Sequence, residues 1–263
     1  MVFNKNISGY KNEEEFSKKL NNKKICELNL MFKEFIFDLF GIVDEDKLIK
    51  CRVDYNKRKY DIVIILNGKI KYISIKKGIK NSIHVEGISR FVHFLIDNGV
   101  PREIIINYLK FHYADGTTNG TGVNRVSAEE YKKDHQQEID EINLFLNNKK
   151  LLLKVIDRFI LKGNLGDKNI DAIIFGVIDD FIWIKKEDVI KVILSHINDY
   201  SSTVHFGPLT IQPLDRCLNR NPKHEKCRFC VQVKWYNLAD DIIINMNNNI
   251  MHNNNCKDEP NLP

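Results

Sequence analysis

Two β-rich segments joined by an Asn-Gly turn constrain the fold of this chain more than any other feature. Residues 60–66 read YDIVIIL and residues 70–76 read IKYISIK, with an Asn-Gly-Lys turn between them. Asn-Gly between two runs of this kind is the strongest short-range signal of a β-hairpin. The hairpin would place Asp61 at the start of one strand, and Ser74 and Lys76 near the end of its partner.

The second strand of this hairpin separates polar from apolar side chains. Side chains alternate along a strand, so Ser74 and Lys76 share one face while Ile73 and Ile75 share the other. A serine and a lysine together inside a very apolar strand are unusual for a core strand and are expected of a functional site. The alternative is an ordinary sheet surface, where an acid and a lysine at strand ends are common.

An acid on one strand, a lysine on the neighbouring strand and a further acid soon after resemble the catalytic core of the PD-(D/E)xK nuclease superfamily, which includes many restriction endonucleases. The resemblance covers about residues 34–95 and departs from the usual pattern in two places. Tyr60 replaces the usual Pro before the first acid, and Ser74 stands where Asp or Glu is usual. A subgroup of restriction enzymes also has Ser there and takes the carboxylate from the following helix, where Glu86 is the corresponding residue here.

The resemblance implies a Mg²⁺ site. Mg²⁺ prefers hard oxygen ligands and keeps several of its waters. The ligands that the resemblance assigns are Asp61, the backbone carbonyl of Ile75 and Glu86. Glu34 lies on a predicted helix over residues 24–40, where family members often present a further acid to the metal; a solvated helix charge is the alternative.

The resemblance also gives roles to the remaining polar residues of the hairpin. Lys76 would orient the attacking water and offset the negative charge that develops on the phosphate. Ser74 cannot replace a carboxylate electrostatically, but its hydroxyl could hydrogen-bond a metal-bound water. The expected catalytic set is therefore Asp61, Ser74, Lys76 and Glu86.

The order of predicted elements fits the fold that the resemblance implies. A helix capped by Asn12, the helix over 24–40 and a strand over 48–53 precede the hairpin, and a helix over 83–97 follows it. We therefore expect an α/β (α+β) fold, with a restriction-endonuclease-like mixed sheet flanked by helices and a β-rich C-terminal part. The later predicted helices cover 101–112, 127–147 and 151–161, and the later strands cover 171–177, 181–185, 203–213 and 227–235.

Three parts are expected along the chain. Residues 1–125 would form the nuclease core, and residues 126–246 would form a helical and β-rich part that completes the core and recognises DNA. The polar, low-complexity segment 247–263 would be a disordered tail.

Two segments are candidates for DNA contact. The Gly-rich loop 114–122 could approach a DNA groove closely, with residues behind it able to reach base edges; a mobile connector is the alternative. The basic connection between the strands over 203–213 and 227–235 could contact phosphates and bases, although a solvated hairpin tip explains its charges as simply. The residues expected to bind DNA are Lys77, Asn124, Arg125, Arg216, Arg220, Lys223 and Arg228.

Cysteine spacing and charge set the outer bounds. The six cysteines lack the spacing of a disulfide framework, which fits a reducing compartment. A zinc site at Cys217, His224, Cys227 and Cys230 has ligand-like spacing, but a strand there would point Cys227 and Cys230 to opposite faces. The net charge of +5 is compatible with a nucleic-acid partner, and the lack of a signal sequence or a membrane-length apolar run makes the cytoplasm the expected location.

These observations predict a Mg²⁺-dependent endodeoxyribonuclease, most simply a type II restriction enzyme that hydrolyses double-stranded DNA at a short specific sequence. A homodimer is expected, because one such site cuts one strand and duplex cleavage needs two sites related by symmetry. Two alternatives stay open. One is a repair or structure-specific nuclease of the same fold, and the other is a non-catalytic DNA-binding protein that lost the acid at Ser74.

Overall fold

The chain forms two compact units, each assembled from separate stretches of sequence. The computed structural model describes residues 9–56, 58–78, 81–163, 166, 168–197 and 203–255. Unit 1 takes in residues 1–81, 161–192 and 237–263, and unit 2 takes in residues 82–160 and 193–236. The division expected near residue 125 does not match these units, because strands far along the chain return to complete the first sheet.

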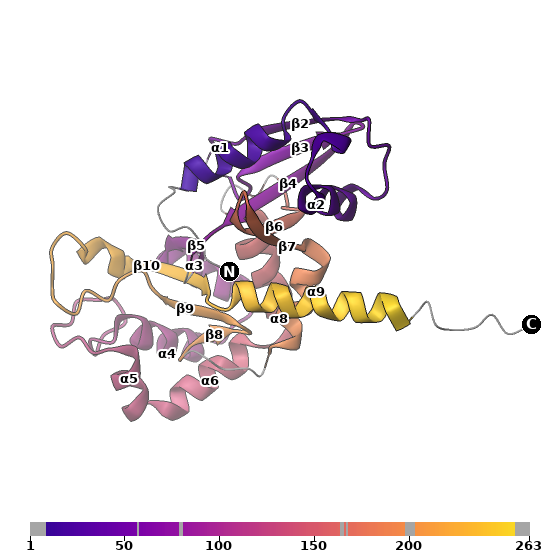
Figure 1. Cartoon of the computed structure of the whole chain (residues 1–263). Helices are drawn as coiled ribbons and strands as arrows, with labels where there is room; N and C mark the ends of the chain where they lie inside the picture. The colour runs from indigo at the N-terminus through magenta and orange to yellow at the C-terminus, as the bar shows by residue number, and fades with distance from the viewer. Residues whose placement is uncertain are drawn as a thin grey trace, which may run out of the picture. The chain divides into compact units, whose positions relative to one another are not determined.

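Unit 1 is built around a six-stranded mixed sheet that contains the predicted hairpin. The hairpin strands pair antiparallel, with Leu66 opposite Lys69 across the turn and Ile62 opposite Ile73. The strands labelled β4 and β6 pair in parallel, and the other neighbouring strands in this sheet pair antiparallel (Figure 1). In order across the sheet, the strands are β1 (Lys23–Lys24), β2 (Leu48–Val53), β3 (Ile62–Leu66), β4 (Lys69–Lys76), β6 (Ala172–Val177) and β7 (Asp180–Lys185).

Two N-terminal helices pack against the sheet to form the apolar core of unit 1. They are α1 (Gly9–Leu20) and α2 (Leu30–Phe40), with a short 3₁₀ turn over Ile25–Glu27 between them. The helix expected over 24–40 therefore begins later, because Asn29 caps α2 by accepting a hydrogen bond from Phe32 N at 3.0 Å. Their apolar side chains bury one face of the sheet, and the cluster includes Phe16, Leu20, Phe32, Phe35, Ile36, Ile62, Ile64, Ile73 and Ile75.

The C-terminal part of the chain also differs from its prediction. The helix α8 (Lys186–Ser195) follows β7, and α9 (Leu238–Asn255) contacts β7. A disordered tail from residue 247 is thus wrong for 247–255, which continue α9, while residues 256–263 lie outside the described residues. Within the described ranges, no helix is both long and apolar enough to cross a membrane.

Unit 2 combines a four-stranded sheet with helices. The sheet order is β5 (Asn81–Gly87), β10 (Cys230–Trp235), β9 (Leu209–Pro213) and β8 (His205–Phe206). Aromatic rings fill its core, with Phe91 5.1 Å from Tyr108 and 5.9 Å from Phe159 between ring centroids. Its helical segments are α3 (Ile88–Asp97), α4 (Arg102–Tyr113), α5 (Ala128–Asp134), α6 (Gln136–Leu146), α7 (Lys149–Val155), a π-helix (Ile156–Lys162) and the 3₁₀ turn η3 (Glu225–Phe229).

Three helix predictions need correction here. Residues 81–87 form a strand, so the helix expected over 83–97 begins only at Ile88. The helix capped by Ser127 breaks at His135 rather than continuing to 147. The helix expected over 151–161 starts earlier, at Lys149, and changes from α to π geometry at Ile156.

Candidate active site

Asp61 is fixed by the backbone of the hairpin. Its amide N donates to Ile73 O at 2.8 Å, which ties the residue to the partner strand just before β3 begins. Its carboxylate turns toward β4, where Oδ2 accepts a hydrogen bond from Ser74 Oγ at 3.0 Å and another from Ile75 N at 2.5 Å. The hairpin therefore determines both the position and the orientation of this acid.

Lys76 lies at the end of β4 and completes the cluster. Its Nζ is 3.5 Å from Asp61 Oδ2 and donates to Ile75 O at 3.1 Å. The side chains of Lys76 and Asp61 are 20% and 21% exposed, so both reach solvent, whereas Ser74 is buried. Ile73 and Ile75 lie in the apolar core on the opposite face. The structure thus brings together three of the four residues expected to be catalytic.

Glu13 on α1 is a second acid near Asp61 that the sequence analysis missed. Burial raises the pKa of Glu13 from 4.5 to about 7, the charge of Asp61 adds to the rise, and Lys76 opposes it. The neighbouring Asn12, which was expected to cap the helix, is buried and donates to Gly176 O at 3.1 Å. In the sequence, Glu13 is only an acid near the start of a predicted helix. Its electrostatic interaction with Asp61 joins distant parts of the chain, so no local pattern indicates it.

Two further lysines interact electrostatically with this acid pair. Burial lowers the pKa of Lys59 from 10.5 to about 7, and the charge of Lys76 lowers it further. Lys77, expected to bind DNA, has its Nζ buried without a hydrogen-bond partner in the described part of the chain. Lysines around two carboxylates suit a phosphodiester, whose negative charge needs compensation beside the acids.

The donor set at Asp61 fits a hard divalent cation. All hydrogen bonds and the ion pair of the Asp61 carboxylate within the described chain involve Oδ2, so Oδ1 is available to a ligand. Glu13 is the second carboxylate within electrostatic reach. Mg²⁺ needs few protein oxygens because it keeps several waters. The carbonyl of Ile75, expected as a ligand, accepts the Lys76 hydrogen bond in this structure.

Glu86 lies in unit 2, on strand β5 rather than on the expected helix. Its Oε2 is 2.6 Å from Arg158 Nη2 and 3.6 Å from His84 Nε2. Burial raises the pKa of Glu86, but its interactions with His84 and Arg158 outweigh burial and hold the pKa below the ordinary value. Its Oε1 is buried and accepts no hydrogen bond from any described residue. Glu86 is therefore ionised, with one oxygen unsatisfied.

Glu34 does not join the cluster. Its side chain is exposed on α2 and shares no hydrogen bond or ion pair with Asp61 among the described residues. The apolar face of α2 is the one that packs on the sheet, which leaves Glu34 on the solvent side. The structure favours the solvated helix charge over the additional metal ligand.

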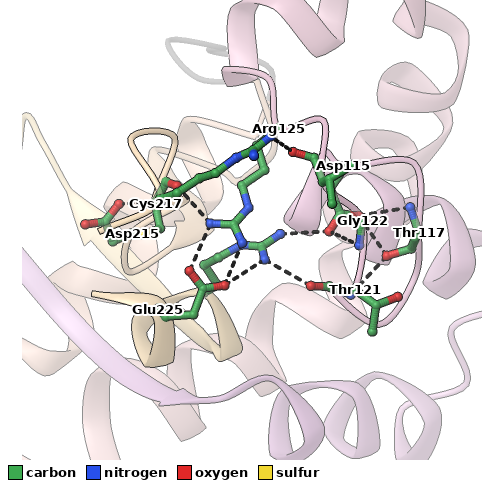
Figure 2. A network of polar contacts seen from close by, with 12 residues as sticks. Asp115, Thr117, Thr121, Gly122, Arg125, Asp215, Cys217 and Glu225 are labelled. Carbon is green, nitrogen blue, oxygen red and sulfur yellow. Dashed lines mark hydrogen bonds and ion pairs between the residues drawn. The ribbon is translucent and has the colours of Figure 1, made fainter. Parts of the chain in front are cut away.

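The residues expected to bind DNA divide into two groups. Asn124, Arg220 and Lys223 are exposed. Arg228 is buried against Asp115. Arg125 is held by Glu225 (Figure 2). Arg216 is half-buried over the ring of Phe111, and burial lowers its pKa to about 10. Arg125, Arg216 and Arg228 thus make contacts within unit 2 that the sequence did not indicate.

The zinc hypothesis gains no support. No group of three or more His, Cys, Asp and Glu side chains in the described ranges could hold a metal ion. The Sγ of Cys217 is buried 3.1 Å from Asn221 O, and His224 Nδ1 lies 3.6 Å from Asp215. Cys227 lies in the 3₁₀ turn η3, so the predicted strand begins only at Cys230.

Comparison with known proteins identifies the fold. No family model matches the sequence, and no curated protein matches it either. Among solved structures, the chain is similar to restriction endonuclease MspI in complex with its cognate DNA, with a TM-score of 0.50 and 15% identity. The match covers 84% of this chain and 83% of that one. The chain therefore has a restriction-endonuclease-like fold, as the sequence analysis predicted.

Proposed function

We propose that this protein is a Mg²⁺-dependent endodeoxyribonuclease that hydrolyses phosphodiester bonds of double-stranded DNA. The observation that carries the proposal is the convergence of Asp61, Ser74 and Lys76 on paired strands of a restriction-endonuclease-like sheet, with Asp61 Oδ2 3.0 Å from Ser74 Oγ and 3.5 Å from Lys76 Nζ. An ordinary sheet surface does not place a lysine ammonium on an acid that is also bonded to a buried serine and a backbone amide. The fold match supports the same reading.

The residues of the site divide the work of hydrolysis. Asp61 Oδ1 and Glu13 would hold the Mg²⁺ ion, which supplies polarisation of the phosphoryl oxygen and activation of water when it is bound. Lys76 orients the attacking water and offsets the charge that develops on the phosphate. Ser74 and the Ile75 amide keep the Asp61 carboxylate in one orientation, which preserves the geometry between turnovers.

The second acid is assigned to Glu13, because the charges of Asp61 and Lys76 act on it within unit 1. Glu86, which the family resemblance implies for this role, is tested beside it. Glu13→Gln and Glu86→Gln separate them: loss of Mg²⁺-dependent cutting without a fall in melting temperature identifies the ligand. The residue whose amide variant still cuts at the parent rate is excluded.

The finer proposal is a type II restriction enzyme that acts as a homodimer on a short sequence. MspI, the solved neighbour, is a restriction endonuclease seen with its cognate DNA, which supports this choice over a structure-specific nuclease. A fixed set of fragments from a sequenced plasmid is expected from a restriction enzyme. Cutting at branches or ends regardless of sequence would favour the repair alternative instead. Sedimentation with and without DNA tests the dimer.

The direct test uses supercoiled plasmid and the purified chain. We expect conversion to linear DNA in Mg²⁺, none in EDTA, and none with the Asp61→Ala variant. End analysis should find 5′-phosphate and 3′-hydroxyl groups, as the family resemblance implies. Equal cutting by the parent and the Asp61→Ala variant would contradict the proposed active site.

A further inference from the structure

Two segments of unit 2 that are distant in sequence form one continuous surface. They are residues 114–126 and 214–229. Arg125 Nη1 donates to Cys217 O at 2.9 Å, and Arg220 on the second segment donates to Val123 O on the first. Figure 2 shows Arg125 and Glu225 meeting between the two segments. Each segment is therefore held to the other by hydrogen bonds, and neither is a separate loop.

A row of alternating charges joins the segments, with Asp115 and Arg228 buried and Arg125 and Glu225 partly exposed. Asp115 Oδ2 is 2.8 Å from Arg228 Nη2, and Arg228 Nη1 is 3.2 Å from Glu225 Oε1. Glu225 also takes two hydrogen bonds from Arg125, at 2.7 and 2.9 Å. These bonds lower the pKa of Glu225 to about 2, so the Glu225 carboxylate stays ionised at any ordinary pH. Two arginines and two carboxylates cancel one another inside the unit.

Asp115, the first of these charged residues, also holds the backbone of the segment 114–126. Asp115 Oδ1 accepts a hydrogen bond from Thr117 N at 2.9 Å, and Asp115 Oδ2 accepts one from Gly122 N at 3.0 Å. Gly120, at φ +77°, leaves no room for a methyl group, because a Cβ there would lie 2.7 Å from the Tyr113 ring. A movement of Arg228 would therefore change the course of the loop that Asp115 holds.

The charges that remain exposed on this surface are mostly positive. Arg220, Lys223 and Lys226 are exposed, and neither lysine has an ion-pair partner among the described residues. Asp215, the remaining carboxylate of the second segment, accepts from Cys217 N at 2.6 Å and lies 3.6 Å from His224 Nδ1. The acids are thus engaged within the protein while the cations face outward.

Three asparagine side chains on this surface share this donor character, two of them exposed and Asn221 half-buried. Asn119 Oδ1 accepts from Thr121 N at 3.2 Å, Asn219 Oδ1 from Asn221 N, and Asn221 Oδ1 from Lys223 N, the last two at 3.1 Å. In each case the oxygen is used by the protein's own backbone, which leaves the NH₂ group as a donor. We call the resulting surface the donor face: Asn119, Asn219, Arg220, Asn221, Lys223 and Lys226.

We propose that the donor face reads duplex DNA, and that the chain Asp115–Arg228–Glu225–Arg125 beneath it positions the face for sequence recognition. This inference rests on the proposed function, of which it identifies the recognition surface. DNA offers many acceptors, namely phosphate oxygens along both strands and base-edge atoms in the grooves. Cations would bind the phosphates, and the amide donors would select among base edges. These four charged residues are positioning residues, because they act through the face and do not touch the DNA.

The first experiment tests the face itself, in the full chain carrying Asp61→Asn so that binding is measured without cleavage. Lys223→Ala with Lys226→Ala should weaken binding to duplex DNA about tenfold and reduce the slope of log affinity against log salt by about 2, since each phosphate contact contributes about 0.9. Lys149→Ala with Lys150→Ala removes the same charge from exposed positions on α7 and should change neither quantity. Equal losses in both double variants would overturn the face as the reading surface, as would equally tight binding of heparin by the parent.

The second experiment tests the positioning role through specificity. A preferred duplex is selected from a random pool with the same full chain, and its affinity is compared with that of a scrambled duplex. Glu225→Gln should reduce this preference about tenfold, with little change in affinity for the scrambled duplex or in melting temperature. Arg125→Lys keeps the charge but loses the paired hydrogen bonds, so it should give an intermediate preference. An unchanged preference in both variants would overturn the positioning role.

These outcomes are separable from the proposed catalysis. If the parent fails to cut DNA in Mg²⁺ but binds duplex through the donor face, the nuclease proposal fails and this inference stands. If the parent cuts DNA and the lysine variants bind and cut as well as the parent, the inference fails and the nuclease proposal stands.

Discussion

Ser74 occupies the position where the family pattern has an acid, and its hydroxyl supports Asp61 rather than replacing the acid. The hydroxyl donates to Asp61 Oδ2 from a buried position, so it orients the remaining carboxylate. A serine carries no charge to share with a cation. In the proposed mechanism the second negative charge comes from Glu13, an acid of unit 1 that interacts electrostatically with Asp61.

Replacement of Ser74 should give a graded result. Ser74→Ala removes one hydrogen bond to Asp61 but no charge, and a neutral-to-charged bond is worth about 1.5–3 kcal/mol, so we expect a fall of about 10- to 100-fold in cleavage rate. The melting temperature should change little, because alanine fits the same buried space. Single-turnover cleavage of a labelled duplex measures the effect. A rate equal to that of the parent would show that Asp61 needs no support from residue 74.

Glu13 makes stability depend on pH. Its folded pKa of about 7 lies above the ordinary 4.5, so the folded state holds the proton more tightly and stability falls as pH rises between these values. The loss above pH 7 is on the order of 1–3 kcal/mol after allowance for partial exposure. Glu13→Gln should therefore melt higher than the parent at pH 8 and at the same temperature near pH 4. Mg²⁺ should raise the parent's melting temperature at pH 8 and not the variant's; a parallel pH dependence in the two proteins would contradict this.

At the scale of elements, local patterns predicted the hairpin and long-range contacts did not follow from them. The Asn-Gly turn and the alternation around Ser74 were sufficient because both depend on neighbouring residues. The sequence did not identify Glu13 as a site residue. Its electrostatic interaction with Asp61 depends on how α1 packs on a sheet that includes β6. Glu86 was predicted to lie on a helix, but residues 81–87 pair as strand β5. The sequence signal of this strand is the alternation of apolar and polar residues over 83–86, which read IHVE.

Arginine roles were equally hidden from sequence. Exposed and buried arginines look alike in a basic segment, and only the carboxylates at Asp115 and Glu225 distinguish them. Asp115 is more than a hundred residues from Arg228, so no local pattern connects the two. The basic segment was recognised as a unit, but the division between its inner and outer cations required the structure.

A glycine substitution tests the packing of the loop at 114–122. A Cβ at Gly122 would lie 2.0 Å from Asp115 O, so Gly122→Ala forces the backbone apart. We expect a stability loss of about 1–3 kcal/mol and a lower melting temperature. Gly87→Ala is the matched control, because its Cβ would have Phe229 O at 4.0 Å as its nearest neighbour. Similar melting of both variants would show that the loop is not packed as described.

At the scale of the whole molecule, the last two strands of the unit 1 sheet, β6 and β7, come late in the sequence. Strand β4 pairs with β6 in parallel, and Asp171 Oδ2 accepts a hydrogen bond from Tyr72 N at 2.8 Å. Unit 1 therefore depends on residues 161–192, which follow most of unit 2. Parallel pairing of this kind requires a long connection, and here the connection contains another folded unit.

Truncation tests this arrangement. A fragment of residues 1–125 lacks β6 and β7 and leaves the edge of β4 unpaired, so we expect it to be unfolded or aggregated. The full chain, prepared in parallel, should show a cooperative thermal transition by circular dichroism. A fragment with dispersed amide signals in an NMR spectrum would support the original boundary at residue 125 instead.

The most direct test of the central claim is the rate of duplex cleavage by a matched pair of lysine variants on one strand. Lys76 lies 3.5 Å from Asp61, whereas Lys69 is exposed at the far end of β4. In saturating Mg²⁺, Lys76→Ala should lower the single-turnover rate by at least about 100-fold, and Lys69→Ala should leave it at the parent value. Equal rates for the two variants would contradict hydrolysis at this site.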